Sequence, residues 1–153
     1  WSEQFGRTIT PRSMMQEFGT QVVRKHLDYD FWVNVCMKKI QSTNTNIVVT
    51  DCRFPNEIKA IRDQGGIVLR VVRGSEPEWY DDAVNMNAGN TNMSWMISKT
   101  RMEKLGIHAS ETAWIGTEFD AVIDNNQEGM DNLFRQVKDL VLNLQGATED
   151  RPV

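Results

Sequence analysis

The chain has 153 residues, enough for one compact domain with a hydrophobic core. Its net charge of −4 argues against a surface that coats nucleic acid, although a local basic pocket is compatible with it. No apolar run approaches membrane-spanning length and no signal peptide is visible, so we expect a cytoplasmic protein without nucleic-acid or membrane partners. Cys36 and Cys52 lack metal-ligand spacing, which favours buried, reduced thiols.

The first part of the chain has the pattern of helices. Thr10-Pro11 joins a residue typical of an N-cap to a proline suited to the first helical position. Apolar residues then recur at helical spacing, and Gly19-Thr20 interrupts them, so we expect a bend or two short helices that meet there. Asp28 or Asp30 should cap the next helix, with one apolar face formed by Trp32, Val35, Cys36 and Ile40.

The middle of the chain predicts a strand–helix–strand unit. A β-branched run, Ile47 to Asp51, precedes a helix that opens at Phe54-Pro55, ends at Gly65-Gly66 and leads to a second apolar strand, Ile67 to Arg73. Such units pair their strands in parallel through a right-handed crossover. Ligands of open parallel sheets bind beyond the carboxyl ends of the strands, which is where Asp51, Arg53 and Arg73 fall.

The segment from Gly74 to Gly116 is the least regular. It contains a polar tract, Asn85 to Asn92, and a predicted helix from about Ser94 to Leu105. A long insertion after a strand is usually a lid, a binding loop or disorder. Its aromatic residues are expected either to pack this insertion or to form a dimer surface: Trp79, Tyr80, Trp95 and Trp114.

The C-terminal part predicts a third strand and a final helix. The strand is expected at Phe119–Ile123, and the helix should run from Met130 to Leu144 before a frayed tail. Three strands alternating with helices indicate an α/β fold with a mainly parallel sheet. We therefore expect a single domain, 1–153, organised as helices (1–45), core (46–73), lid-like insertion (74–117), core (118–145) and tail (146–153).

Arginines are the residues best suited to chemistry in this sequence. A guanidinium matches phosphate oxygens bidentately, and several around the strand ends would form a phosphate-transfer pocket. For any one of them a surface ion pair is the more frequent role, but Arg53 and Arg73 should converge because both follow strands of one crossover. The arginines considered are Arg12, Arg24, Arg53, Arg73 and Arg101.

Other candidates have competing interpretations. Asp51 could hold a magnesium-bound water or accept a hydroxyl proton, or it could cap a turn or hold Arg53. Glu57 is better suited to stabilise the N-terminus of a helix than to take part in the phosphate site. His108, Ser110 and Glu111 are neighbours in sequence and so make a poor catalytic triad. His26 and His108 lack ligand spacing, and Asn125 suits either a base contact or turn chemistry.

In order along the chain, these residues resemble the phage-type deoxynucleoside monophosphate kinases, relatives of adenylate kinase and dephospho-coenzyme A kinase. The matching blocks are Thr10-Pro-Arg12…Gln16…Gly19-Thr20…Arg24, Asp30-x-Trp32-Val33, Val49-x-Asp51-x-Arg53-Phe-Pro-Asn-Glu57, Gly65-Gly66-x-Val68-x-Arg70-Val-x-Arg73, His108-x-Ser110-Glu111 and Asp120-x-x-Ile123-x-Asn125. Each block alone is weak, and their order over nearly the whole chain is fairly specific.

The resemblance implies a P-loop-kinase-like three-layer fold and transfer of a phosphoryl group from ATP, with Mg²⁺, to a deoxynucleoside monophosphate. Asp51 and Arg53 look like the central catalytic pair, with Arg73 and Arg101 as further catalytic cations and Asp51 as a water-mediated metal ligand. Asn125 and Lys99 look like donor contacts. The implied substrate-binding residues are Arg12, Gln16, Gly19, Thr20, Arg24, Trp32, His108, Ser110 and Glu111.

One departure from this family pattern is large. The sequence contains no GxxxxGK[ST], the loop that cradles phosphates in such kinases, and family members carry it N-terminal to the blocks above. We expect either the C-terminal portion of a kinase, which lacks its N-terminal strand and P-loop, or a descendant that lost donor binding. The expected partners are the nucleotide and either a second copy or the missing N-terminal segment, in the host cytoplasm if the chain is phage-encoded.

Two other functions stay open at this stage. The chain could be a non-catalytic module that binds a nucleotide or a protein in the same pocket, or a structural accessory domain of a larger assembly. The isolated chain is expected to show no detectable kinase activity. The sequence predicts neither the preferred base nor the oligomeric state.

Overall fold

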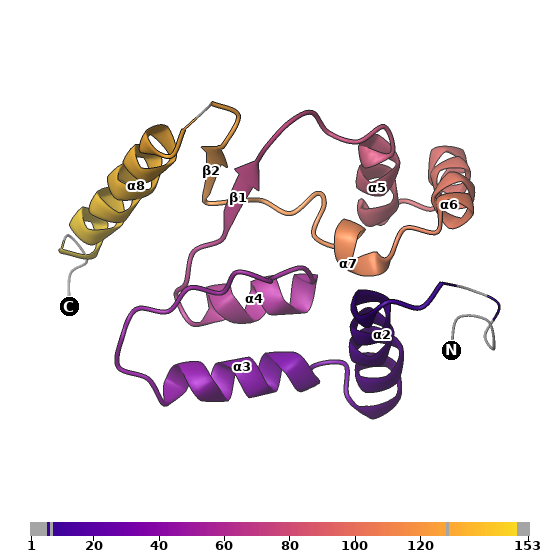
Figure 1. Cartoon of the computed structure of the whole chain (residues 1–153), viewed down its shortest axis with the longest axis horizontal. Helices are drawn as coiled ribbons and strands as arrows, with labels where there is room; N and C mark the ends of the chain where they lie inside the picture. The colour runs from indigo at the N-terminus through magenta and orange to yellow at the C-terminus, as the bar shows by residue number, and fades with distance from the viewer. Residues whose placement is uncertain (1–5, 7, 128, 150–153) are drawn as a thin grey trace. The chain divides into compact units, whose positions relative to one another are not determined.

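The computed structural model describes residues 6, 8–127 and 129–149 (Figure 1). Its contacts divide the chain into two compact units, residues 1–52 and 53–153, which are described separately. None of the helices within these described ranges is long and apolar enough to cross a membrane. Cys36 and Cys52 are not joined in a disulfide, and both are half-buried, so the expected full burial is not confirmed.

The first unit is helical. It contains α2 (Pro11–Glu17), η1 (Phe18–Leu27) and α3 (Phe31–Gln41). Thr10 caps α2 as predicted: its Oγ1 accepts from the backbone N–H of Ser13 at 3.0 Å, while Ser13 Oγ accepts from the N–H of Thr10 at 2.9 Å. This reciprocal pair satisfies two N–H groups that lack partners within the helix.

The predicted break near Gly19 is confirmed as a change of helix type. The chain passes from an α-helix to the wider π-helix η1 at Phe18, without leaving the helical path. The carbonyl oxygen of Gly19 accepts a hydrogen bond from Trp32 Nε1 at 3.2 Å, which links η1 to α3. Of the two candidate caps of α3, Asp30 occupies the N-cap position, and Asp28 Oδ1 accepts from the N–H of Asp30 at 2.9 Å.

The strand predicted at Ile47–Asp51 is wrong. Residues 46–53 have no regular secondary structure, and Val48 is 84% exposed. A strand is stabilised by hydrogen bonds to a neighbouring strand and by a covered face, and the described part of the chain provides neither for this run. The predicted strand–helix–strand arrangement therefore lacks its first strand. The boundary between the two compact units falls in this irregular segment, between Cys52 and Arg53.

The second unit contains a small parallel sheet. Strand β1 (Leu69–Val72) follows α4 (Pro55–Asp63), and β2 (Ala121–Asp124) pairs with it from Leu69↔Ala121 to Val72↔Asp124. The pairing is extended by the N–H of Asp120, which donates to Val68 O, and by that of Asn125, which donates to Val72 O, both at 2.8 Å. The described fold is thus a mostly helical α/β arrangement with a two-stranded parallel sheet.

Helix α8 (Asp131–Glu149) follows β2 and is tied to the end of that strand. The Gln136 amide accepts from the N–H of Asp124 at 2.9 Å and donates to its carbonyl at 2.7 Å. The predicted helix is confirmed, but it continues past the expected end at Gly146, so the predicted tail is helical up to Glu149. The rest of that tail, residues 150–153, lies outside the described ranges.

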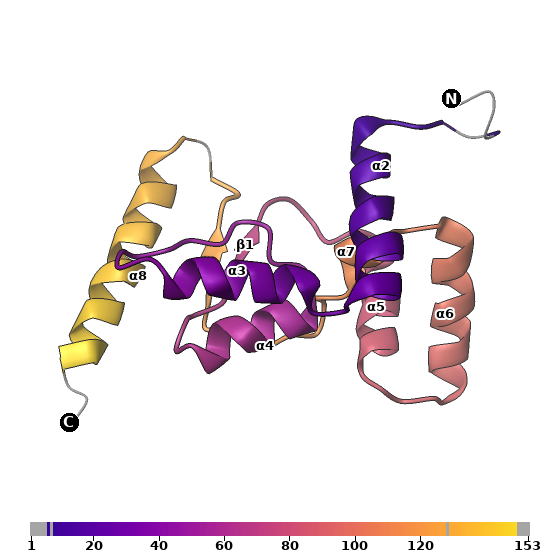
Figure 2. The same ribbon diagram turned by 90° about the horizontal axis from the view of Figure 1, so that it is seen from below.

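The predicted lid-like insertion is far more regular than expected. Helices α5 (Tyr80–Asn87) and α6 (Met93–Leu105) pack side by side as a hairpin, and the short helix α7 (Ala109–Thr112) follows (Figure 2). Helix α6 confirms the prediction. The Asn-rich tract was expected to be irregular, yet its first residues, Asn85–Asn87, belong to α5.

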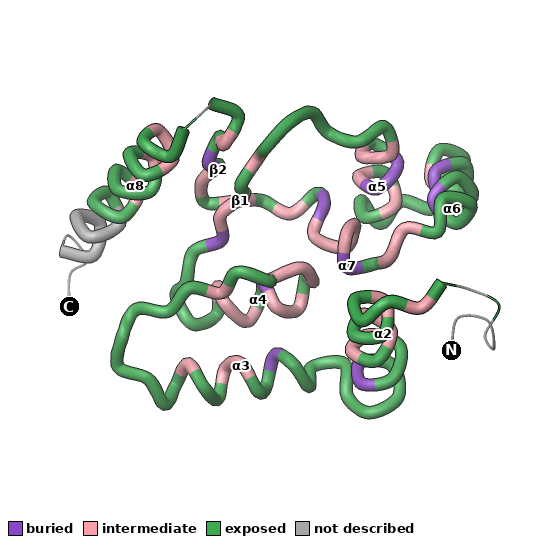
Figure 3. Tube along the Cα trace, viewed as in Figure 1, coloured by how far each residue is buried: buried purple, intermediate pink, exposed green. Residues whose placement is uncertain are grey.

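Tertiary contacts explain why this polar tract is helical. Asn87 Nδ2 donates to the carbonyl oxygens of Thr112 and Ile115, at 2.7 and 2.9 Å, so its amide supports the packing of α5 against the segment around α7. The hairpin and the segment after α7 share a buried core of Ala83, Met102 and Ile115. Figure 3 shows buried positions on both α5 and α6. Three of the four aromatic residues of the insertion, Trp79, Tyr80 and Trp114, pack against this core.

Candidate functional site

Arg53 directly precedes α4, and its backbone is fixed by Glu57. Glu57 Oε2 accepts from the N–H of Arg53 at 2.7 Å and from that of Phe54 at 3.0 Å. A carboxylate in the first turn also interacts favourably with the positive end of the helix dipole. The prediction that Glu57 supports the helix N-terminus is therefore confirmed.

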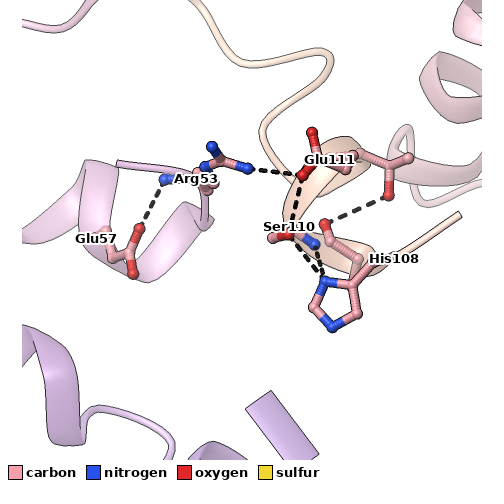
Figure 4. Close-up of polar contacts among 7 residues, drawn as sticks. Arg53, Glu57, His108, Ser110 and Glu111 are labelled. Carbon is pink, nitrogen blue, oxygen red and sulfur yellow. Dashed lines mark hydrogen bonds and ion pairs between the residues drawn. The ribbon is translucent and has the colours of Figure 1, made fainter. Parts of the chain in front are cut away.

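The side chain of Arg53 is oriented by an acid far away in sequence. Arg53 Nη1 donates to Glu111 Oε1 at 2.7 Å, and the two side chains are 41% and 39% exposed (Figure 4). Within the described residues, Nε and Nη2 of Arg53 have no hydrogen-bond partner. One edge of the guanidinium is thus held, while the opposite edge is open to a ligand.

The predicted trio at α7 lies next to this arginine. His108 is the N-cap of α7, and its Nδ1 accepts from the backbone N–H of Ser110 at 3.2 Å and lies 2.8 Å from Ser110 Oγ. Ser110 is buried, and its Oγ lies 3.5 Å from Glu111 Oε1. The structure therefore brings His108, Ser110, Glu111 and Arg53 into one polar cluster (Figure 4).

This cluster is not a nucleophilic triad. A triad needs an acid that holds the histidine and a histidine that faces the nucleophile through its other nitrogen. In this cluster Glu111 contacts Ser110 and Arg53, and His108 Nε2 is buried without a hydrogen-bond partner among the described residues. The arrangement is suited to holding Arg53, not to activating Ser110.

Arg73 follows β1 and is exposed, without a hydrogen bond or ion pair to the described residues. Nearby in sequence, Arg70 is engaged: its guanidinium lies 5.2 Å from the ring centre of Tyr80 and 5.3 Å from that of Trp114, and it forms an ion pair with Glu76. Cation–π contacts of this kind join β1 to the helical insertion. Sequence reasoning gave Arg70 no role, because only tertiary structure brings the two aromatic rings together.

The cations of the insertion have partners within it. Arg101 Nη1 lies 3.2 Å from Asp82 Oδ2, and the Asp82 side chain is only 8% exposed. Ser98 Oγ donates to the other carboxylate oxygen at 2.8 Å. Lys99 lies over the Trp95 ring at 5.0 Å and 3.9 Å from Glu103. These contacts provide structural roles for both predicted phosphate-facing cations.

The remaining predicted residues belong to the first unit. Arg12 and Gln16 lie on α2, Gly19, Thr20 and Arg24 on η1, Trp32 on α3, and exposed Asp51 on the irregular segment. Arg24 is buried: its Nη1 donates to Tyr29 O at 3.3 Å, and its guanidinium lies 5.9 Å from the Tyr29 ring centre. The predicted site residues are therefore divided between the two units.

The described residues contain no preformed cluster of metal ligands. No group of three or more histidine, cysteine, aspartate or glutamate side chains among them could hold an ion, and Asp51 has no second carboxylate in such a group. Asn125, a predicted donor contact, is engaged through its backbone N–H at the end of β2. Sequence and described structure thus provide neither a P-loop nor a preformed Mg²⁺ site.

Comparison with known proteins places the chain in a family. The sequence profile of the deoxynucleotide monophosphate kinase family matches residues 3–97, which is more than half of the chain. The match includes Arg12, Asp51, Arg53 and Arg73, and it ends before Arg101, Glu111 and Asn125. Neither the curated proteins nor the solved structures that were compared include a match. The chain belongs to the deoxynucleotide monophosphate kinase family.

Proposed function

We propose that this chain supplies the acceptor site and the phosphate-binding arginines for phosphoryl transfer from ATP to a deoxynucleoside monophosphate. The observation that carries the proposal is Arg53: it lies inside the family match, it is held on one edge, and it presents Nε and Nη2 on the other. That pair of N–H groups has the spacing of two phosphate oxygens. The complete enzyme would have the three-layer kinase architecture.

Phosphoryl transfer suits such a group. The transferred phosphoryl carries charge on its equatorial oxygens, and the protein contributes mostly positioning and charge neutralisation. A half-exposed guanidinium that is already oriented can contact an incoming phosphate without first ordering a long side chain. We assign Arg53 to the acceptor phosphate.

The first unit carries predicted substrate-binding residues of its own. Arg12 and Gln16 are four residues apart on α2, so they share one face of that helix. One charged and one amide side chain on a single face can together bind a phosphate and a base or sugar edge. Arg24, on η1, contacts Tyr29 through its guanidinium.

Membership of this family implies the use of ATP and Mg²⁺. The described residues contain no group of three or more candidate ligands that could hold a metal ion. In the proposal the ATP-binding loop lies N-terminal to Trp1 or has been lost. If the loop has been lost, the chain would be a non-catalytic module that binds a nucleotide or a protein. The observation that supports this alternative is the absence of GxxxxGK[ST] from the sequence.

Calorimetric titration with each of the four deoxynucleoside monophosphates tests the proposal, and a coupled ADP-release assay tests for turnover. We expect measurable binding of at least one nucleotide and no turnover by this chain. Absence of binding for all four would overturn the acceptor-site proposal. Robust turnover would show that this chain binds the donor by itself, which contradicts the proposed location of the ATP site.

A further inference from the structure

We propose that Glu111 is a positioning residue that sets the orientation of Arg53 and does not itself contact the substrate. This inference rests on the proposed function, because it concerns how the same phosphate is bound. Glu111 lies outside the part of the chain that matches the family profile. The resemblance of the sequence to the kinases implied that Glu111 binds the substrate directly. The positioning role proposed for it differs from that expectation.

The contact geometry supports an indirect role. Glu111 Oε1 lies 2.7 Å from Arg53 Nη1, the distance expected for a short, charge-assisted hydrogen bond. The two residues are 58 positions apart, so this bond joins α7 at the end of the insertion to the start of α4. A carboxylate that contacted a phosphate directly would be repelled by it, whereas a carboxylate behind the guanidinium orients the cation.

Both partners are themselves fixed. Glu57 holds the backbone of Arg53 through the N–H groups at the start of α4, and Ser110 Oγ lies 3.5 Å from the Glu111 oxygen that contacts Arg53. Ser110 is in turn held by His108, at 2.8 Å from Nδ1 (Figure 4). A side chain whose supporting contacts are ordered loses less rotational freedom when its ligand arrives.

The nitrogen of Arg53 that Glu111 contacts determines which edge of the guanidinium is open to a ligand. Glu111 occupies Nη1, which leaves the side-on edge formed by Nε and Nη2. A guanidinium can bind two phosphate oxygens in parallel through this side-on edge or through the end-on edge of Nη1 and Nη2, and the ion pair at Nη1 favours the side-on edge. Loss of Glu111 would keep the charge of Arg53 but release its orientation.

The first test observes Arg53 without any ligand. In a chain labelled with ¹⁵N-arginine, hindered rotation should give Arg53 separate Nη resonances, assigned by their disappearance in Arg53→Lys. Glu111→Gln should merge these resonances. Glu118→Gln is the matched control, because Glu118 is exposed and its side chain forms no hydrogen bond or ion pair with the described residues. An unchanged Nη pattern in Glu111→Gln would overturn the positioning role.

The second test is a double-mutant cycle on nucleotide affinity, measured by calorimetry with a deoxynucleoside monophosphate. Glu111→Gln should weaken binding about threefold to tenfold in the wild-type background and less than about twofold in the Arg53→Ala background. An equal loss in both backgrounds would mean that Glu111 contacts the substrate directly. Tighter binding in Glu111→Gln would mean that it competes with the phosphate. Either result contradicts the inference.

The two tests separate the inference from the function on which it rests. Absence of nucleotide binding by the wild-type chain overturns the proposed function and, with it, the substrate-related part of the inference. The resonance measurement still decides whether Glu111 orients Arg53. Thermal unfolding of Glu111→Gln and Glu118→Gln, expected to agree closely with wild type, shows that an affinity change does not arise from a loss of folded protein.

Discussion

Two arginine–carboxylate pairs of the second unit differ in a way that separates binding from stability. In the pair of Arg53 and Glu111 both side chains are about equally exposed, at 41% and 39%. In the pair of Arg101 and Asp82 the arginine is 63% exposed and the acid only 8%. A buried carboxylate requires partners, whereas a half-exposed pair contributes little to folding and leaves its cation accessible. The first pair is suited to a ligand and the second to holding a hairpin together.

The largest expected effect concerns the buried acid. Ser98→Ala removes the hydroxyl that donates to Asp82 Oδ1 at 2.8 Å, and it leaves this buried oxygen only the longer contact with Arg101 Nη1 at 3.4 Å. We expect a loss of about 1.5–3 kcal/mol in the free energy of unfolding. Chemical denaturation should show it as a lower midpoint with an unchanged slope. A midpoint equal to wild type would show that this carboxylate does not depend on the hydroxyl.

Arg53→Ala should reduce nucleotide affinity and leave stability almost unchanged. It removes the proposed phosphate contact, so we expect affinity for the deoxynucleoside monophosphate to fall about 10- to 100-fold, as for loss of a charged hydrogen bond. The unfolding midpoint should change little because the pair is half-exposed. Arg135→Ala on α8, whose guanidinium contacts only Asn132 among the described residues, is the control. Equal affinity losses in the two variants would remove the special role of Arg53.

Arg101→Ala distinguishes the two interpretations of that residue. Its contact with Asp82 predicts that the variant loses about 1 kcal/mol of stability. The loss should be modest because the Arg101 side chain is mostly exposed and Ser98 Oγ still donates to the Asp82 carboxylate. A lid cation that contacts phosphate, as the family resemblance implies, would instead alter nucleotide affinity at constant stability. Calorimetry and denaturation of the same preparation decide between them.

The smallest expected effect is at the start of α4. Glu57→Ala removes the side-chain acceptor of the Arg53 and Phe54 N–H groups and should lower stability by about 0.5–1 kcal/mol, as for loss of a cap. Since this cap also fixes the backbone of Arg53, nucleotide affinity should decrease slightly in the same variant. A large gain in affinity would contradict the role assigned to this cap.

The sequence predicts those elements whose signals are local. The cap at Thr10, the break before Gly19, helix α6 and strand β2 all depend on residues within a few positions of each other, and the structure confirms them. Ile47–Asp51 has the composition of a strand, but a strand also needs a neighbour, and composition does not supply one. Asn85–Asn87 reads as a loop because its stabilising bonds come from the segment after α6.

The candidate site shows the same limit. The resemblance identified Arg53 and Glu111 as separate candidates, and their type and position could be predicted. The bond between them could not, because it depends on the packing of α7 near the start of α4. Likewise, the resemblance implied that Arg101 is a catalytic cation, and only the fold of the hairpin shows the buried acid with which it pairs.

The central claim is that the open edge of Arg53 binds the phosphate of a deoxynucleoside monophosphate. Titration of the ¹⁵N-arginine-labelled chain with the nucleotide tests it most directly, with Arg135 as the internal reference. We predict that the Nε resonance of Arg53 shifts in proportion to the bound fraction measured by calorimetry, while that of Arg135 stays in place. Nucleotide binding with an unmoved Arg53 resonance would contradict the claim.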